Sequence, residues 1–149
     1  MNNIRPARES DASRIAEMLV TNYRVNFYKF FKNDEYYFGE LNVIDKAAEF
    51  TNDPSAVRET FVYDDGAVKG FIRISGTEIV KLYVEPTFQS CGIGGALVEY
   101  AIGQFGADHL WALEYNERGQ AFYRRHGFEL TGEKMTEDEW VPLLMMRRK

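Results

Sequence analysis

The sequence predicts an α+β fold, and three observations carry this prediction. Apolar residues recur at helical spacing in two stretches ahead of residue 54. From residue 59 to residue 85 the apolar residues alternate with a period of two, as in β-strands. Helical and strand-like stretches then follow one another to the C-terminus, which gives the order β-α-α-β-β-β-α-β-α-β-β.

The first part of the chain is expected to hold one short strand and two helices. The range 4–8 suits an edge strand, and the Ser10 hydroxyl that follows it suits a helix N-cap. The first helix is indicated by apolar positions at helical spacing, namely Ile15, Leu19 and Tyr23. The second is expected over 35–50, through Tyr37, Leu41, Ile44 and Ala48. The run Asn52-Asp53-Pro54 is expected to end it.

Three antiparallel strands are expected next, because turn residues divide the alternating region. The strands are expected at 59–63, 68–74 and 78–85, separated by Asp64-Asp65-Gly66 and by Ser75-Gly76. The remaining elements are a helix at 94–104, a strand at 109–114, a helix at 117–126 and two strands at 128–131 and 141–146. Asn116 and Gly127 suit the two ends of the last helix.

Size and composition restrict the class of protein. A chain of 149 residues is expected to fold as one domain over 1–149. A net charge of -5 disfavours nucleic acid as a partner. Cys91 is the only cysteine, so neither an internal disulfide nor a cysteine-based zinc site can form, and His109 and His126 are too isolated to predict a metal. No apolar run approaches the length of a membrane helix, and 1–10 is charged, so we expect a cytoplasmic protein.

The segment VEPTFQSCGIGGALVEY places three glycines between an expected strand and an expected helix. Unpaired amides at a helix start bind anions when the backbone can be approached closely, so Gly92, Gly94 and Gly95 indicate a phosphate or pyrophosphate site. A flexible turn with tight helix packing explains the same glycines. Ala96 and Leu97 exclude the nucleotide P-loop, which needs Lys and then Ser or Thr. Only one feature of a dinucleotide-binding fingerprint is present, namely an acidic residue, Glu114, about 20 residues after the glycines.

Two blocks of the sequence resemble the GNAT superfamily of acetyl-CoA-dependent N-acetyltransferases. Gln89, Gly92 and Gly94 resemble the pyrophosphate motif of the family, Q/R-x-x-G-x-G/A, and they follow the strand-like run EIVKLYVEP. The stretch EYNERGQAFYRRHGFELTGE resembles the N-x-x-A-x-x-F-Y-x-x-x-G-F region of the family, with one extra residue after the asparagine. Residues 78–128 carry both blocks, and the element order matches the family over nearly the whole chain.

The resemblance implies a three-layer α/β/α fold around a twisted mixed sheet whose fourth and fifth strands splay apart. The coenzyme arm then enters at the backbone of Leu82, Tyr83 and Val84. The pyrophosphate is held by Gln89, Ser90, Cys91, Gly92, Ile93, Gly94, Gly95 and Ala96, and the second block contributes Asn116, Ala121, Phe122 and Tyr123. Gln89 replaces the commoner arginine, and Cys91 stands where glycine or a basic residue is frequent. A homodimer is also a habit of the family.

Acetyl transfer needs one group that accepts a proton and one that donates a proton. An amine of pKa ~10.4 must lose a proton before it attacks. Glu78 lies at the end of a row of alternating positions with Val80, Leu82 and Val84, where burial would raise its pKa towards that of a general base, although a solvated strand end explains it equally. Tyr123 resembles the tyrosine of the family that protonates the leaving thiolate. Without that block, an aromatic helical position is usually core.

The acceptor is expected to be a primary amine of a small molecule or a peptide. The stretch NYRVNFYKFFKNDEYYFGE is rich in aromatic residues, and the resemblance implies that Phe27, Tyr28, Phe31 and Tyr37 line the acceptor pocket. Core packing together with a dimer surface is the commoner explanation for such residues. Two other functions stay open on the sequence: a non-catalytic module that binds acyl-CoA or a partner, and a nucleotide-dependent enzyme.

Overall fold

The computed structural model describes residues 3–149 and contains a seven-stranded mixed sheet in the order β1-β2-β3-β4-β5-β7-β6. The strands are β1 (Ile4–Pro6), β2 (Thr60–Asp64), β3 (Val68–Ser75), β4 (Glu78–Val84), β5 (His109–Leu113), β6 (Phe128–Glu137) and β7 (Val141–Arg148). The helices are α1 (Ala12–Asn26), α2 (Tyr28–Phe31), α3 (Val43–Thr51), α4 (Pro54–Glu59), α5 (Ile93–Phe105) and α6 (Glu117–Arg125). The short turns are η1 (Glu9–Asp11), the π-helical η2 (Tyr36–Glu40) and η3 (Pro86–Phe88).

The chain divides into two compact units. The first comprises the chain up to Arg73 together with Lys81–Leu97, and the second comprises Ile74–Val80 with Val98–Lys149. The boundaries cut through β3, β4 and α5, so these elements contribute residues to both units. The expectation of one domain over 1–149 stays a prediction, and Met1 and Asn2 lie outside the described residues.

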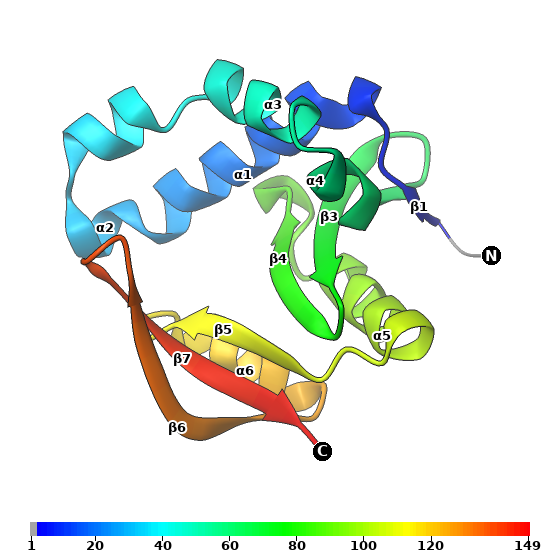
Figure 1. Ribbon diagram of the computed structural model, residues 1–149, viewed down its shortest axis with the longest axis vertical. Helices are drawn as coiled ribbons and strands as arrows, with labels where there is room; N and C mark the ends of the chain where they lie inside the picture. The colour runs from blue at the N-terminus through cyan, green and yellow to red at the C-terminus, as the bar shows by residue number, and fades with distance from the viewer. Residues whose placement is uncertain (1–2) are drawn as a thin grey trace. The chain divides into compact units, whose positions relative to one another are not determined.

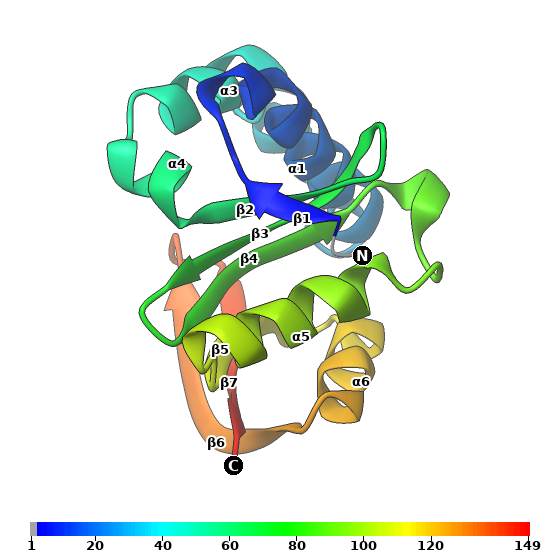
Figure 2. The ribbon, with the colours of Figure 1, turned by 90° about the vertical axis from the view of Figure 1, so that its right-hand side faces the viewer.

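The first unit places helices on both faces of β2, β3 and β4. Helices α1 and α3 lie side by side on one face (Figure 1). On the opposite face, the absence of a side chain at Gly70 lets the first turn of α5 approach β3: an added Cβ would lie 3.1 Å from Ile93 Cγ2 and 3.3 Å from Leu97 Cδ1. Figure 2 shows these strands edge-on between the two helical layers. Because strand residues alternate, Gly70 faces α5 whereas Phe71 faces α1.

The second unit is built on β5, β7 and β6. The first residues of β4 pair in parallel with β5 through Glu78↔His109 and Ile79↔Leu110. Strand β7 is antiparallel to both β5 and β6, and the β6–β7 register shifts between Leu130 and Lys134. Helix α6 packs against β6 and covers one face of these strands (Figure 2). The core of the second unit includes Phe128 and Met146, both fully buried.

The α+β class, the mixed sheet and the order of the expected elements are confirmed. The antiparallel β2–β3 hairpin lies where the alternation predicted it, and helices cover both sheet faces of the first unit, as a three-layer fold requires. The late strands are also present, although β6 runs six residues beyond its expected end at Thr131.

The structure corrects the N-terminal helices. Ser10 lies inside η1 and does not cap α1, which begins at Ala12. The single helix expected over 35–50 is interrupted: η2 ends at Glu40 and the Asn42 side chain caps α3 by accepting from Asp45 N at 2.8 Å. This break turns Ile44 outward, where it is 82% exposed. Pro54 ends one helix and begins the next, because a proline at the first helical position has no N–H to leave unpaired.

Candidate functional site

Strand β4 presents alternate residues to the two faces of the first unit. The Tyr83 ring lies 5.6 Å from that of Tyr23 in α1 and 5.8 Å from that of Phe71 in β3. Tyr83 and Lys81 therefore face α1 and α3, and the alternation directs Leu82 and Val84 to the opposite face. The three residues expected to offer their backbone to a coenzyme thus contribute side chains to two different layers.

The glycine segment forms a tight turn into α5. Ser90 and Gly92 adopt left-handed conformations, with φ of 65° and 85°. Gly92 is exposed, and an added Cβ there would meet no atom within 4 Å. The first intrahelical bond runs from Ala96 N to Gly92 O at 3.0 Å, so the amides of Ile93, Gly94 and Gly95 precede the hydrogen-bonded part of the helix. These amides, with the helix dipole, make a suitable anion site.

The Gln89 side chain holds this turn in place through two hydrogen bonds. Its Nε2 donates to Asn22 Oδ1 at 3.2 Å and to the Val84 carbonyl at 3.3 Å. Gln89 therefore links the loop to α1 and to the end of β4 through its side chain. The neighbouring Cys91 is exposed on the loop.

Asn22 is a residue of this region that the sequence analysis missed. It is 1% exposed, and its Nδ2 donates to Met18 O at 2.8 Å and to Val84 O at 3.0 Å. The sequence held a signal for it, because Asn22 follows Met18 and Leu19 by four and three residues and so shares the apolar stripe of α1. A polar residue on a core-facing stripe needs internal partners.

Helix α6 carries the second block. Asn116 caps it by accepting from Gly119 N at 2.9 Å, and a Cβ at position 119 would lie 2.8 Å from Asn116 Cγ. Gln120, also missed from sequence, is buried and donates to the carbonyls of Leu113 and Glu114, each at 3.0 Å. The cap and this buried amide fix the start of α6 at the end of β5. Ala121 and Phe122 follow on the same helix and are half-buried.

Tyr123 lies on α6 with its ring 5.2 Å from that of Phe122 and 6.1 Å from that of Phe128. Burial of the hydroxyl raises the pKa of Tyr123 above its ordinary value near 10. The phenol therefore stays protonated throughout the neutral range. A protonated phenol can donate a hydrogen bond to a developing anion, which is the property that a general acid needs.

Glu78 is the first residue of β4 and is half-buried. It lies beside His109 in the β4–β5 register, and the His109 Nδ1 atom is 2.7 Å from an Asp108 carboxylate oxygen. The row of alternating positions that begins at Glu78 is less apolar than expected, because Val80 is 39% exposed. A half-buried carboxylate keeps access to solvent, which is compatible with a general base.

Two of the aromatic residues expected around an acceptor, Tyr28 and Tyr37, pack against each other. Tyr37 is 2% exposed, and burial together with the neighbouring Tyr36 raises its pKa to about 12. The Tyr28 ring contacts those of Tyr37 and Phe38 at 5.9 and 5.4 Å, and its hydroxyl hydrogen-bonds to Asp34. Phe27 and Phe31 are half-buried nearby in sequence. The structure thus places Tyr37 in the core and leaves the other three partly accessible.

Within residues 3–149, neither a metal cluster nor a membrane-spanning helix is found. No three His, Cys, Asp or Glu side chains in this range come together as metal ligands. His126 instead contacts Glu99, with its Nδ1 atom 2.7 Å from a carboxylate oxygen. In the same range, no helix has the length and apolar character needed to cross a bilayer.

The chain matches a protein-family model and resembles several solved structures. Residues 57–130 match the family model described as an acetyltransferase (GNAT) domain. The solution structure of apo-form YjaB from Escherichia coli superposes with a TM-score of 0.78 at 23% identity, covering 97% of this chain and 95% of YjaB. The chain carries a GNAT acetyltransferase domain. The part of the GNAT domain matched by the model includes the glycine turn and α6, whereas β1, α1, α3 and β7 lie outside it.

Sequence relatives of this GNAT domain cover less of the chain. Escherichia coli YjaB, named a peptidyl-lysine N-acetyltransferase, is 33% identical over 73 residues, which are 49% of this chain and 50% of YjaB. The chain therefore spans about half the length of this curated relative. A second solved structure, PaiA N-acetyltransferase from Thermoplasma acidophilum in complex with coenzyme A, has a TM-score of 0.71 at 19% identity, and 97% of each chain is covered.

Proposed function

We propose that this chain is an acetyltransferase that moves an acetyl group from acetyl-CoA to a primary amine of a small molecule or peptide. The observation that carries the proposal is the glycine turn, which follows β4 and the short η3 and leaves the amides of Ile93, Gly94 and Gly95 at the start of α5. The family match over this segment supports it. The name of YjaB, a peptidyl-lysine N-acetyltransferase, and the coenzyme A in the PaiA complex agree with it.

In the first unit, the proposed coenzyme-binding segments are Leu82–Val84 and the loop 89–96. In the second unit, the family resemblance adds Asn116 and residues 121–123 of α6. Acetyl-CoA brings an activated thioester, and the chain has to hold its diphosphate. The loop 89–96 carries no charged side chain, so the attraction comes from backbone amides and the helix dipole. The open space beside Gly92 fits a close approach of phosphate to the backbone.

The proposed reaction is direct attack within a ternary complex. Glu78 takes a proton from the acceptor ammonium through a water relay, because an amine of pKa ~10.4 is protonated at neutral pH and the alternation along β4 directs Glu78 to the face opposite Lys81. Backbone groups of Leu82–Val84 polarise the thioester carbonyl while the neutral amine attacks its carbon. The tetrahedral intermediate then releases the extra proton on its nitrogen to water and expels the thiolate, which leaves the amide. Tyr123 donates to that thiolate. Since its pKa is raised by burial and a thiol has a pKa of ~8.5, most of its contribution is a hydrogen bond as charge develops on sulfur.

Two arms of one experiment test the proposal. Calorimetric titration with acetyl-CoA, NAD and ATP identifies the ligand class, and coenzyme release is then followed across a panel of amines that includes a lysine peptide. Binding of acetyl-CoA with release of coenzyme A supports the enzyme. Binding without product from any amine favours the alternative, a non-catalytic acyl-CoA or partner-binding module. Binding of NAD or ATP instead contradicts both. We also propose a homodimer, which is a habit of the family, and sedimentation measurements test it.

A further inference from the structure

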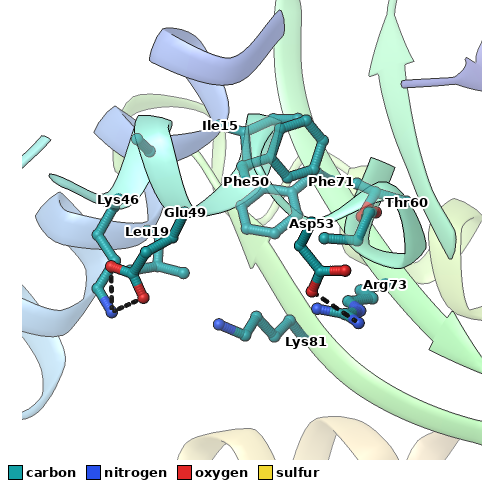
Figure 3. A pocket seen from close by; sticks show the side chains of 12 residues that line it. Ile15, Leu19, Lys46, Glu49, Phe50, Asp53, Thr60, Phe71, Arg73 and Lys81 are labelled. Carbon is teal, nitrogen blue, oxygen red and sulfur yellow. Dashed lines mark hydrogen bonds and ion pairs between the residues drawn. The ribbon is translucent and has the colours of Figure 1, made fainter. Parts of the chain in front are cut away.

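The first unit contains a cavity between its helices and the sheet, with a volume of about 150 Å³ (Figure 3). It opens between α1, α3 and α4 above β2, β3 and β4. Its apolar wall is made by buried side chains from three elements, chiefly Ile15, Leu19, Phe50 and Phe71. An apolar cavity of about 150 Å³ is large enough to hold a benzene-sized group. The wall therefore suits one aromatic ring or one branched aliphatic side chain.

The sheet side of the cavity is cationic. Arg73 on β3 and Lys81 on β4 both line it. Arg73 uses Nε and Nη2 to donate to Glu59 Oε1 at 3.0 and 2.8 Å, and these bonds leave the two N–H groups of Nη1 for another acceptor. The Lys81 ammonium has three donors, so it can bind a ligand in addition to a protein partner. In Figure 3 the Lys81 side chain extends along the cavity below Asp53.

The acidic groups at the rim already interact with cations. Glu49 lies 3.3 Å from the Lys46 ammonium, and most of its side chain is exposed. Asp53 caps α4 by accepting from Ser55 N at 3.0 Å, and its other oxygen is 3.9 Å from Arg73 Nη2. The side chains of Glu49 and Asp53 are 63% and 48% exposed, against 24% for Arg73, whereas Glu59, which pairs with Arg73, is also 24% exposed. This arrangement favours an anionic group of the ligand near Arg73 and Lys81.

We propose that this cavity binds a small apolar molecule that carries a carboxylate, and that this molecule is the acceptor amine. The second half rests on the proposed function. The carboxylate accepts from Arg73 Nη1 and from the Lys81 ammonium, and the apolar body of the molecule fills the space against Phe50 and Phe71. Lys81 immediately precedes Leu82–Val84 on β4, and strand residues rise about 3.3 Å each, so a molecule held there lies next to the strand segment assigned to the thioester. The acceptor class is thus an amino acid with an apolar side chain.

Ligand binding tests the cavity without any need for turnover. Amide resonances are recorded by NMR while 3-phenylpropanoate is added, and 3-phenylpropan-1-ol serves as the uncharged ligand of the same body. The carboxylate is expected to shift the amides of Phe50, Phe71, Arg73 and Lys81, with at least tenfold higher affinity than the alcohol. Lys81→Met is expected to remove the preference for the carboxylate, and Lys81→Arg is expected to retain it. Lys149→Met makes the same charge change at an exposed terminus and is expected to leave the preference unaltered. Equal affinities for the two ligands, or shifts elsewhere, overturn the site.

Turnover tests the acceptor class. We compare kcat/KM for phenylalanine with phenethylamine, and for leucine with 3-methylbutylamine, since each amine lacks only the carboxylate. The proposal expects at least tenfold higher kcat/KM for the amino acids. Equal values, or acetylation of a lysine peptide alone, overturn the acceptor assignment while the proposed enzyme stands. If acetyl-CoA binds but no amine is acetylated, the proposed enzyme fails and so does the acceptor assignment, and the NMR titration alone decides whether the cavity binds carboxylates.

Discussion

The side-chain amide of Asn22 donates a hydrogen bond to the backbone carbonyl of Val84 at 3.0 Å. The same carbonyl accepts from Gln89 Nε2 at 3.3 Å, and Gln89 also donates to Asn22 Oδ1. One buried amide of α1 therefore fixes both the last residue of β4 and the first residue of the glycine loop. Because these two segments are the proposed coenzyme site, their relative placement depends on Asn22.

Replacing Asn22 with leucine is expected to weaken acetyl-CoA binding about tenfold. The leucine fills the space but leaves Val84 with one partner fewer and Gln89 without its acceptor on α1, which costs about 1–3 kcal/mol of unfolding free energy. Calorimetric titration with acetyl-CoA and chemical denaturation measure the two effects. Asn42→Ala is the matched control: it removes the cap of α3, destabilises by about 1 kcal/mol and leaves the coenzyme affinity unchanged. Equal affinities for both variants would show that Asn22 acts on stability alone.

Gly92→Ala tests the turn itself. The residue has a φ of 85°, so alanine strains the backbone by about 1–2 kcal/mol and adds a methyl group where the phosphate is proposed to approach. Acetyl-CoA affinity is expected to fall at least tenfold, measured by the dependence of Tm on ligand concentration. Gly66→Ala strains the β2–β3 turn at least as strongly, with φ of 118° and open space for the Cβ. It should lower Tm at least as much without any loss of affinity.

The sequence predicted the order of elements and the glycine turn because both depend on local patterns. Alternation over β3 and β4 and the strand-to-helix change at Gly92 are visible without tertiary information. The break after Glu40 was missed, since the apolar spacing continues through it while the backbone caps at Asn42. Asn22 and Gln120 were missed because their roles depend on carbonyls at Val84 and Leu113 that only the folded chain brings near.

Tyr123→Phe is expected to lower kcat by about 100-fold or more and to leave the acetyl-CoA affinity within about twofold. The change removes only the hydroxyl that is proposed to donate to the thiolate, and the ring contacts with Phe122 and Phe128 remain. Steady-state coenzyme release and calorimetric titration give the two quantities. Tyr100→Phe removes a hydroxyl from α5, where the ring lies 6.2 Å from Phe105, and should change neither quantity. Unchanged turnover in Tyr123→Phe would reject the assigned acid.

Alkaline pH is expected to destabilise the protein through its buried tyrosines. Burial raises the pKa of Tyr37 to about 12, whereas an unfolded chain releases the proton near pH 10. Between these values the folded state binds more protons than the unfolded state, so the unfolding free energy falls as pH rises, by at most about 1.4 kcal/mol per pH unit for each such group. Tyr123 acts with the same sign, because its pKa is also raised by burial. Denaturation curves at intervals between pH 9 and 11.5 measure the slope.

Tyr37→Phe separates this proton linkage from packing. The ring and its contacts with Tyr28 and Tyr36 are kept, and only the titrating hydroxyl is lost. Below pH 9 both states hold the proton, so any stability difference between variant and parent is constant with pH and reports packing alone. Above pH 10 the parent loses stability faster than the variant, and the two curves converge or cross. Parallel curves over the whole range would mean that the Tyr37 hydroxyl titrates alike in both states, which contradicts its burial in the core.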